Sequence, residues 1–184
     1  SFPVTTQSTE AQTWFDRGIL WTYGYNHEEA VTCFEHAIDA DPECAMAHWG
    51  AGYASGPNYN MPWDLFDYAG RVAAAQAGYT HARKALDLID GVTGWEAALI
   101  HALPARHPQP DPLDPKAMKA WNADFADAMR DVFAAHPESH EVRTVFAESL
   151  LNLTPWKMWD LTSGQPAAGA RTLEAQTVLE DALE

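Results

Sequence analysis

The stretch Trp14–Pro42, "WFDRGILWTYGYNHEEAVTCFEHAIDADP", contains two segments with helical periodicity and a short polar turn between them. One face of each segment combines small and large residues, namely Trp14, Gly18 and Trp21 in the first, and Ala30, Phe34 and Ala37 in the second. Small residues opposite large rings let two antiparallel helices approach closely, and Pro42 ends the second segment. The stretch therefore predicts a helical hairpin in which the face of Trp14, Gly18 and Trp21 packs on the paired helix.

These residues stand at the spacing of a known repeat. The segment 11–44 resembles the tetratricopeptide repeat, a unit with the pattern W-x2-L-G-x2-Y, then A-x3-F, then a closing Pro. Arg17 stands where Leu is usual and Trp21 where Tyr is usual. Gly52 follows Gly18 at one repeat length, so a second unit begins on schedule. The resemblance implies a right-handed stack of antiparallel helical hairpins, an α-solenoid.

Helical periodicity dominates the rest of the chain and predicts an all-α fold. Capping-box spacing at Asn26 with Glu29 and at Thr93 with Glu96, and the pair Asp114-Pro115, mark helix starts. We expect one helical repeat domain over 1–184, with helices near 9–24, 27–40, 45–55, 64–90, 94–106, 115–135 and 139–153, and an eighth from about 170. The proline-rich segment 107–115 is expected to be an extended connector, and 161–169 a turn-rich loop.

Two octets share the pattern Pro-Trp-x-(Leu/Met)-(Phe/Trp)-Asp: "NMPWDLFD" (Asn60–Asp67) and "LTPWKMWD" (Leu153–Asp160). Spacing typical of a second repeat helix returns after each interruption, at Phe125, Met129, Val132 and Pro137, and at Ala175, Leu179 and Ala182. Each octet is therefore predicted to join the first and second helices of an expanded repeat. This favours an architectural role for the octets, with a ligand-gripping role as the alternative.

The last predicted helix has no closing proline before Glu184. A repeat that ends in this way lacks a polar capping helix, which predicts that the sequence is a fragment of a longer repeat protein. The irregular repeats, with "DPECAMAHWG" and "SGPNYN", also resemble those of bacterial tetratricopeptide-like proteins.

Composition narrows the function classes. The net charge of −15 argues against a nucleic-acid partner, which requires a basic surface. The two cysteines form no disulfide framework, the first residues lack a secretion signal, and no apolar run is long enough for a membrane span. The expected location is the cytoplasm, without membrane attachment.

A second apolar face predicts where a partner binds. Phe15, Ile19 and Tyr23 lie opposite the hairpin face of the first helix, and Met46, Trp49 and Tyr53 form a similar stripe in the next unit. In tetratricopeptide-like arrays the first helix of each unit lines a concave groove that binds peptides, so the resemblance places these stripes there. Trp63, Trp156 and Trp159 are expected at the rim. We expect a scaffold that binds a peptide or helix of a partner protein, with acidic rim residues favouring basic segments; core packing of the stripes is the alternative.

Other chemistry is less favoured. Asp64, Asp67 and Asp160 lie near tryptophans, so the alternative function is a small-molecule-binding or enzymatic helical protein with a Trp/Asp-lined pocket. Acids at such positions are more often helix caps, and no catalytic motif is present, so we predict no enzyme. Cys33, His36, Cys44 and His48 have turn-spaced ligand types, but buried cysteines are common, and His136 and His140 flank a turn. We predict no metal and no cofactor.

Overall fold

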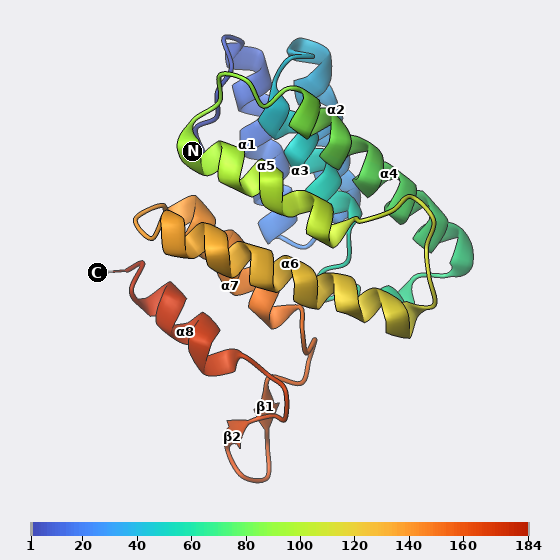
Figure 1. Cartoon of the computed structure of the whole chain (residues 1–184), viewed down its shortest axis with the longest axis vertical. Coiled ribbons are helices and arrows are strands. Elements are labelled where there is room, and N and C mark those ends of the chain that lie inside the picture. Colours follow the sequence, from blue (N-terminus) through green and yellow to red (C-terminus); the bar gives the residue numbers. More distant parts are fainter. Residues whose placement is uncertain (1, 184) are drawn as a thin grey trace.

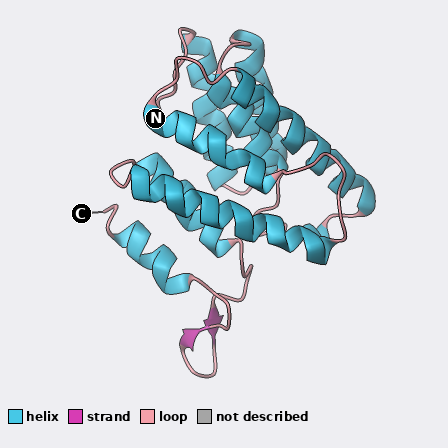
Figure 2. Ribbon diagram, in the orientation of Figure 1, coloured by secondary structure: helices cyan, strands magenta, loops and turns pink. Residues whose placement is uncertain are grey.

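The computed structural model describes residues 2–183 as a mostly helical protein (Figures 1 and 2). Eight α-helices lie within this range: α1 (Thr9–Tyr23), α2 (His27–Ala40), α3 (Ala45–Ser55), α4 (Tyr68–Asp87), α5 (Gly94–Arg106), α6 (Pro115–Ala135), α7 (His140–Leu151) and α8 (Thr172–Glu180). A 3-10 helix, η1 (Trp63–Leu65), precedes α4, and an antiparallel pair, β1 (Trp159–Asp160) and β2 (Gln165–Pro166), precedes α8. The helical prediction is confirmed, whereas the periodicity did not predict the strand pair.

The hairpin predicted from Trp14–Pro42 is present, with α1 packed on α2 and α2 on α3. The fully buried ring of Phe34 lies between two glycines, Gly18 of α1 and Gly50 of α3. A Cβ atom would come within 2.6 Å of this ring at Gly18 and within 2.5 Å at Gly50. The three helices therefore pack closely because both neighbours of the phenyl ring lack a side chain.

Trp21 differs from its prediction. Trp14 does pack on α2, with its ring 4.6 Å from that of His36, but Trp21 is 44% exposed. The buried stripe of α1 runs instead through Ala11, Phe15, Gly18, Ile19 and Thr22. This stripe is rotated away from Trp21, which explains why the residue lies at the edge of the hairpin.

Polar caps determine where the helices start. The side chain of Asn26 accepts from Glu29 N, Glu96 closes a capping box with Thr93, and Asp114 accepts from Lys116 N, as predicted. The helix expected from residue 64 starts later. Asp67 Oδ1 accepts a hydrogen bond from Gly70 N (2.6 Å), so α4 begins at Tyr68 and η1 occupies the preceding residues.

Helices that follow one another in the chain pack on each other. In addition, α3 packs on α5 as well as on α4. Figure 1 shows α6, α7 and α8 grouped on one side of the molecule, beyond α1–α5. Residues 107–114 form the extended connector between the two groups, as predicted. Each Pro-Trp octet connects two helices that pack on each other, α3 with α4 and α7 with α8.

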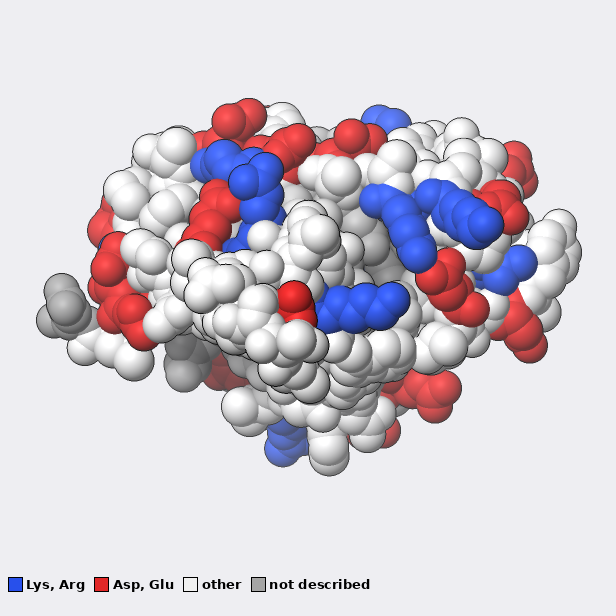
Figure 3. Space-filling view, turned by 90° about the horizontal axis from the view of Figure 1, so that it is seen from below, with Lys and Arg blue, Asp and Glu red and all other residues white. Residues whose placement is uncertain are grey.

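Charged side chains of both signs lie near one another on one face of the molecule (Figure 3). On the face in Figure 3, seen from below the orientation of Figure 1, basic and acidic side chains are interspersed. Lys119 pairs with Asp64 and Arg130 with Asp127, both at 2.6 Å. Along residues 2–183 we find no helix that is both long and apolar enough to cross a membrane.

Candidate functional site

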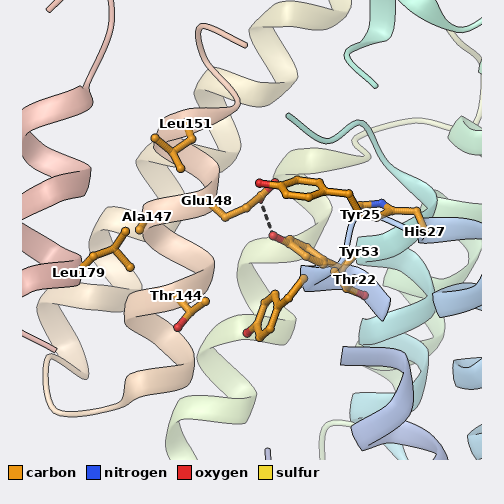
Figure 4. A pocket seen from close by; sticks show the side chains of 10 residues that line it. Thr22, Tyr25, His27, Tyr53, Thr144, Ala147, Glu148, Leu151 and Leu179 are labelled. Atoms are coloured by element: carbon orange, nitrogen blue, oxygen red, sulfur yellow. Dashed lines mark hydrogen bonds between the residues drawn. The ribbon is translucent and has the colours of Figure 1, made fainter. Parts of the chain in front are cut away.

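A cleft lies between α7 on one side and α1 and α3 on the other (Figure 4). Part of it is a cavity of about 230 Å³. α7 contributes Thr144, Ala147, Glu148 and Leu151, and the opposite side contributes Thr22, Tyr23, Tyr25, His27 and Tyr53. Leu179 of α8 completes the lining. The cavity is therefore built by helices that are distant in the sequence.

A second cavity, of about 370 Å³, adjoins the first, since Tyr23 and Thr144 line both. It extends along α1 past Ile19 to Asp16, and along α7 to His140 and Glu141. We call the two cavities together the α1–α7 groove. Its length along two helices is suited to an extended or helical segment rather than to a single compact ligand.

A hydrogen bond connects the two sides of the groove. Tyr53 Oη of α3 donates to Glu148 Oε2 of α7 at 2.5 Å (Figure 4). Burial raises the pKa of Tyr53 well above its ordinary value, and the Glu148 carboxylate raises it further. The guanidinium of Arg106 lies 4.7 Å from the centre of the Tyr53 ring. Tyr53 is thus a protonated donor held between a cation and a carboxylate.

The remaining polar groups make the groove acidic. Desolvation raises the pKa of Tyr23, and the carboxylates of Glu141 and Glu148 add to the rise. Burial lowers the pKa of His27 to about 4, with a further contribution from Arg106, and its Nδ1 lies 3.0 Å from Ala54 O. The imidazole is therefore neutral at pH 7 and donates from Nδ1. Among the described lining residues, acidic side chains are present and Lys and Arg are absent.

The segment Phe2–Thr6 packs at one end of the groove. Its Phe2 ring lies 5.4 Å from Phe15 and 6.4 Å from Trp49. The carboxamide of Gln12 holds the backbone of the segment: Nε2 donates to Phe2 O (3.0 Å), and Oε1 accepts from Val4 N (2.9 Å). The chain thus binds one of its own irregular segments through an aromatic side chain and main-chain hydrogen bonds.

Three predicted groove residues, Ile19, Tyr23 and Tyr53, line the groove. Phe15, Met46 and Trp49 have no exposed surface, so their assignment to the open groove needs correction: they belong to the core. The reason is that Phe2 covers Phe15 and Trp49, and Trp49 Nε1 donates to Leu99 O of α5 at 3.2 Å.

The predicted rim tryptophans are not at this groove. Trp63 and Trp156 line a different cavity, between the Pro-Trp loops. Trp159 lies in β1 and is 40% exposed.

Sequence reasoning missed the α7 side of the groove. Thr144, Ala147, Glu148 and Leu151 recur at helical spacing on a face different from the core residues Val142, Val145, Phe146, Ser149 and Leu150. Only Ala147 and Leu151 of this set are apolar, so the search for a second apolar face that identified Ile19 and Tyr23 would not have found Thr144 and Glu148. Tyr25 and His27 gave no such signal, because they lie at the turn between α1 and α2.

The other polar candidates have local roles. Asp67 caps α4, Asp160 accepts from Thr162 N and Ser163 Oγ, and Asp64 pairs with Lys119.

Cys33 and Cys44 are buried free thiols, His36 packs on Trp14, and His48 Nδ1 lies 3.2 Å from His81 Nδ1. His136 is the C-cap of α6, while His140 begins α7 and lines the groove. In the described part of the chain, no three His, Cys, Asp or Glu side chains form a metal-sized cluster.

Comparison of the chain with models of protein families, with curated proteins and with solved structures finds no match. What the protein does is therefore inferred from the groove and from the chemistry of its lining.

Proposed function

We propose that the protein is a binding scaffold, without catalytic activity, that holds a peptide or helix of a partner protein in the α1–α7 groove. We further propose that its helices form a right-handed, tetratricopeptide-like stack. The Phe34 ring between Gly18 and Gly50, and the sequential packing of the helices, support this architecture. In such a stack α1, α3 and α7 are the first helices of their units, and they contribute most of the groove lining, beside Phe2, Tyr25, His27 of α2 and Leu179 of α8.

The observation that carries the proposal is the way the segment Phe2–Thr6 is bound. It inserts an aromatic ring beside Phe15 and Trp49, while Gln12 pairs with its backbone at two points. Main-chain hydrogen bonds supply affinity for an extended segment, and pockets for its side chains supply selectivity. The unfilled part of the groove, past Phe2, offers a partner segment an apolar lining together with the polar groups of Thr144, Glu141 and Glu148.

The lining indicates what that segment contains. Tyr23, Tyr53, Leu151 and Leu179 form an apolar surface suited to a large aliphatic or aromatic anchor. Glu141 and Glu148 lie close enough to Tyr23 to raise its pKa, so the groove carries a negative field. A lysine or arginine next to the anchor complements that field and increases the association rate.

The test is selection of peptides from a random displayed library on the intact chain. Enriched peptides should contain an aromatic or large aliphatic residue next to a basic one. The Tyr23→Ala variant should bind them about tenfold more weakly or worse, because Tyr23 is a partly exposed wall of both cavities. Glu148→Gln should weaken the binding of basic peptides and leave the binding of neutral peptides unchanged.

Tyr68→Ala is the matched control, since Tyr68 is 71% exposed on α4 and lines neither cavity. Selected peptides should bind this variant as tightly as the unmodified chain. Equal loss of binding in Tyr23→Ala and Tyr68→Ala, or the absence of any enriched peptide, would contradict the proposal.

A further inference from the structure

A separate cavity of about 650 Å³ lies between the two Pro-Trp loops. The first octet contributes residues 62–65 and the second contributes 153–157, while α6 contributes Lys119 and Asn122. We call this space the loop cavity. Its volume falls in the range of about 300–1,000 Å³ that is typical of small-molecule sites. The two copies of the octet, remote in sequence, are thus brought together around one space.

The two octet tryptophans are used differently. Trp63 is 1% exposed and packs on Trp121, with ring centres 6.0 Å apart. Trp156 is 56% exposed and has a left-handed backbone with a φ of 59°, in a turn where Lys157 N donates to Thr154 O. A bulky residue in this conformation is rare, and such residues cluster at ligand sites. Trp156 therefore supplies the cavity with an open aromatic surface.

Two carboxamides line the loop cavity. Asn122 is 7% exposed and Asn152 is 3% exposed. The Nδ2 of Asn152 donates to Glu148 Oε1. The Oδ1 atoms of both side chains are buried, and neither has a hydrogen-bond partner within residues 2–183. Buried acceptors of this kind favour a ligand that brings hydrogen-bond donors.

The charges and the buried acceptors of the lining disfavour charged ligands. Asp64 is paired with Lys119 at 2.6 Å, and Lys157 adds a second ammonium group. Two lysines against one carboxylate disfavour a cation. The buried Oδ1 acceptors of Asn122 and Asn152 disfavour an anion, because an anion offers them no donor. A neutral ligand that carries donors fits both conditions.

We propose that the loop cavity binds a neutral, hydroxylated sugar ring. The apolar C–H face of the ring packs on the indole of Trp156, and its hydroxyl groups donate to Oδ1 of Asn122 and Asn152. Hydroxyls also accept, so the Lys119 ammonium group at the rim completes the set. None of the residues that line this cavity lines the α1–α7 groove, and Glu148 of the groove is linked to the cavity through its hydrogen bond with Asn152. The sugar site does not depend on the partner proposed for the groove.

The probes are methyl α-glucoside, methyl α-mannoside, methyl α-galactoside, N-acetylglucosamine and maltose, added at millimolar concentrations to the intact chain. Saturation-transfer NMR and calorimetry should show saturable binding of at least one, with a change in tryptophan fluorescence. Nicotinamide, a flat neutral molecule without hydroxyls, should not compete. Absence of binding by all five sugars, or preferential binding of nicotinamide, would overturn the proposal.

Trp156→Ala should weaken the binding of the sugar roughly tenfold or more, because the stacking surface is lost. Trp159→Ala is the matched control: it removes an indole of the same octet that is similarly exposed and lies outside the loop cavity lining. Equal affinity of these two variants would contradict the role of Trp156.

Asn122→Leu separates binding from folding. Sugar binding should fall at least tenfold, while the thermal midpoint stays the same or rises, since an unpartnered buried acceptor is removed. A variant that keeps full sugar affinity would show that Asn122 does not contact the sugar, and one that loses stability together with binding would show that its carboxamide is structural.

Discussion

The α1–α7 groove and the loop cavity differ in how their polar groups are satisfied. In the groove, the polar side chains of Tyr53 and His27 have partners in neighbouring helices. In the loop cavity, Asn122 and Asn152 keep buried oxygens without a partner in the described chain. The groove follows from regular helical packing, whereas the cavity is made by insertions that interrupt it. We propose that the regular part of the sequence forms a surface for a segment of a partner, and that the irregular part forms a site for a small molecule.

The largest expected effect is the difference in stability between two tryptophan variants. Trp49→Ala removes a fully buried indole stacked on Tyr53 at 5.1 Å, and should lower the free energy of unfolding by about 3–5 kcal/mol. Trp156→Ala removes a largely exposed indole and should change it by less than about 0.5 kcal/mol. Urea unfolding followed by circular dichroism measures both. Similar losses of unfolding free energy in the two variants would contradict the assignment of Trp49 to the core and of Trp156 to an exposed surface of the loop cavity.

Acid should destabilise the protein through the partly buried His27 and the fully buried His107. Burial lowers the pKa of His27 to about 4 and that of His107 to about 3, both below the value of about 6.5 in an unfolded chain. The unfolded state therefore binds more protons below pH 6.5, and stability falls as the pH drops from about 6.5 toward 3. The total loss should exceed about 1.4 kcal/mol, the equivalent of one pKa unit.

Urea unfolding at a series of pH values measures this slope. His27→Gln should make the slope shallower, while His101→Gln, at an exposed position of α5, should leave it unchanged. Equal slopes in the two variants would show that His27 is not a source of the acid sensitivity.

The smallest expected effect is the difference in folding free energy between removing a polar group that has a hydrogen-bond partner and removing one that has none. Tyr53→Phe removes the hydrogen bond to Glu148 and should cost about 1–2 kcal/mol of folding free energy. Asn122→Leu should cost nothing or add up to about 1 kcal/mol, because its buried oxygen has no partner along residues 2–183. Thermal unfolding compares them directly, and the reverse order would contradict the contrast between the two regions.

Much of the helix pattern could be predicted because its signals are local. Asn26, Thr93 and Asp114 cap the helices that they were expected to cap. The start of α4 was misplaced because the helix was extended back to residue 64, although Asp67 was among the acids expected to be helix caps. Trp21 was misplaced because family spacing fixes an approximate face of a helix, not the angle at which that face meets its neighbour.

The site could be predicted only in part, because it depends on contacts between segments that are distant in the sequence. Periodicity identified a second apolar face on α1 and α3, but it could not show that Phe2 covers Phe15 and Trp49. It also could not pair α1 with α7, which are separated by more than a hundred residues. The duplicated octets were visible in the sequence, whereas their meeting around one cavity required the fold.

The most direct measurement is an amide NMR titration of the intact chain with a peptide selected for binding. Binding in the α1–α7 groove predicts that shift changes concentrate in residues 19–25 and 140–151 and are much smaller in Tyr23→Ala at the same peptide concentration. Amides of the two Pro-Trp loops should not move. Shift changes centred on residues 60–67 and 153–160, or retained in full by Tyr23→Ala, would contradict the assignment of the groove as the protein-binding site.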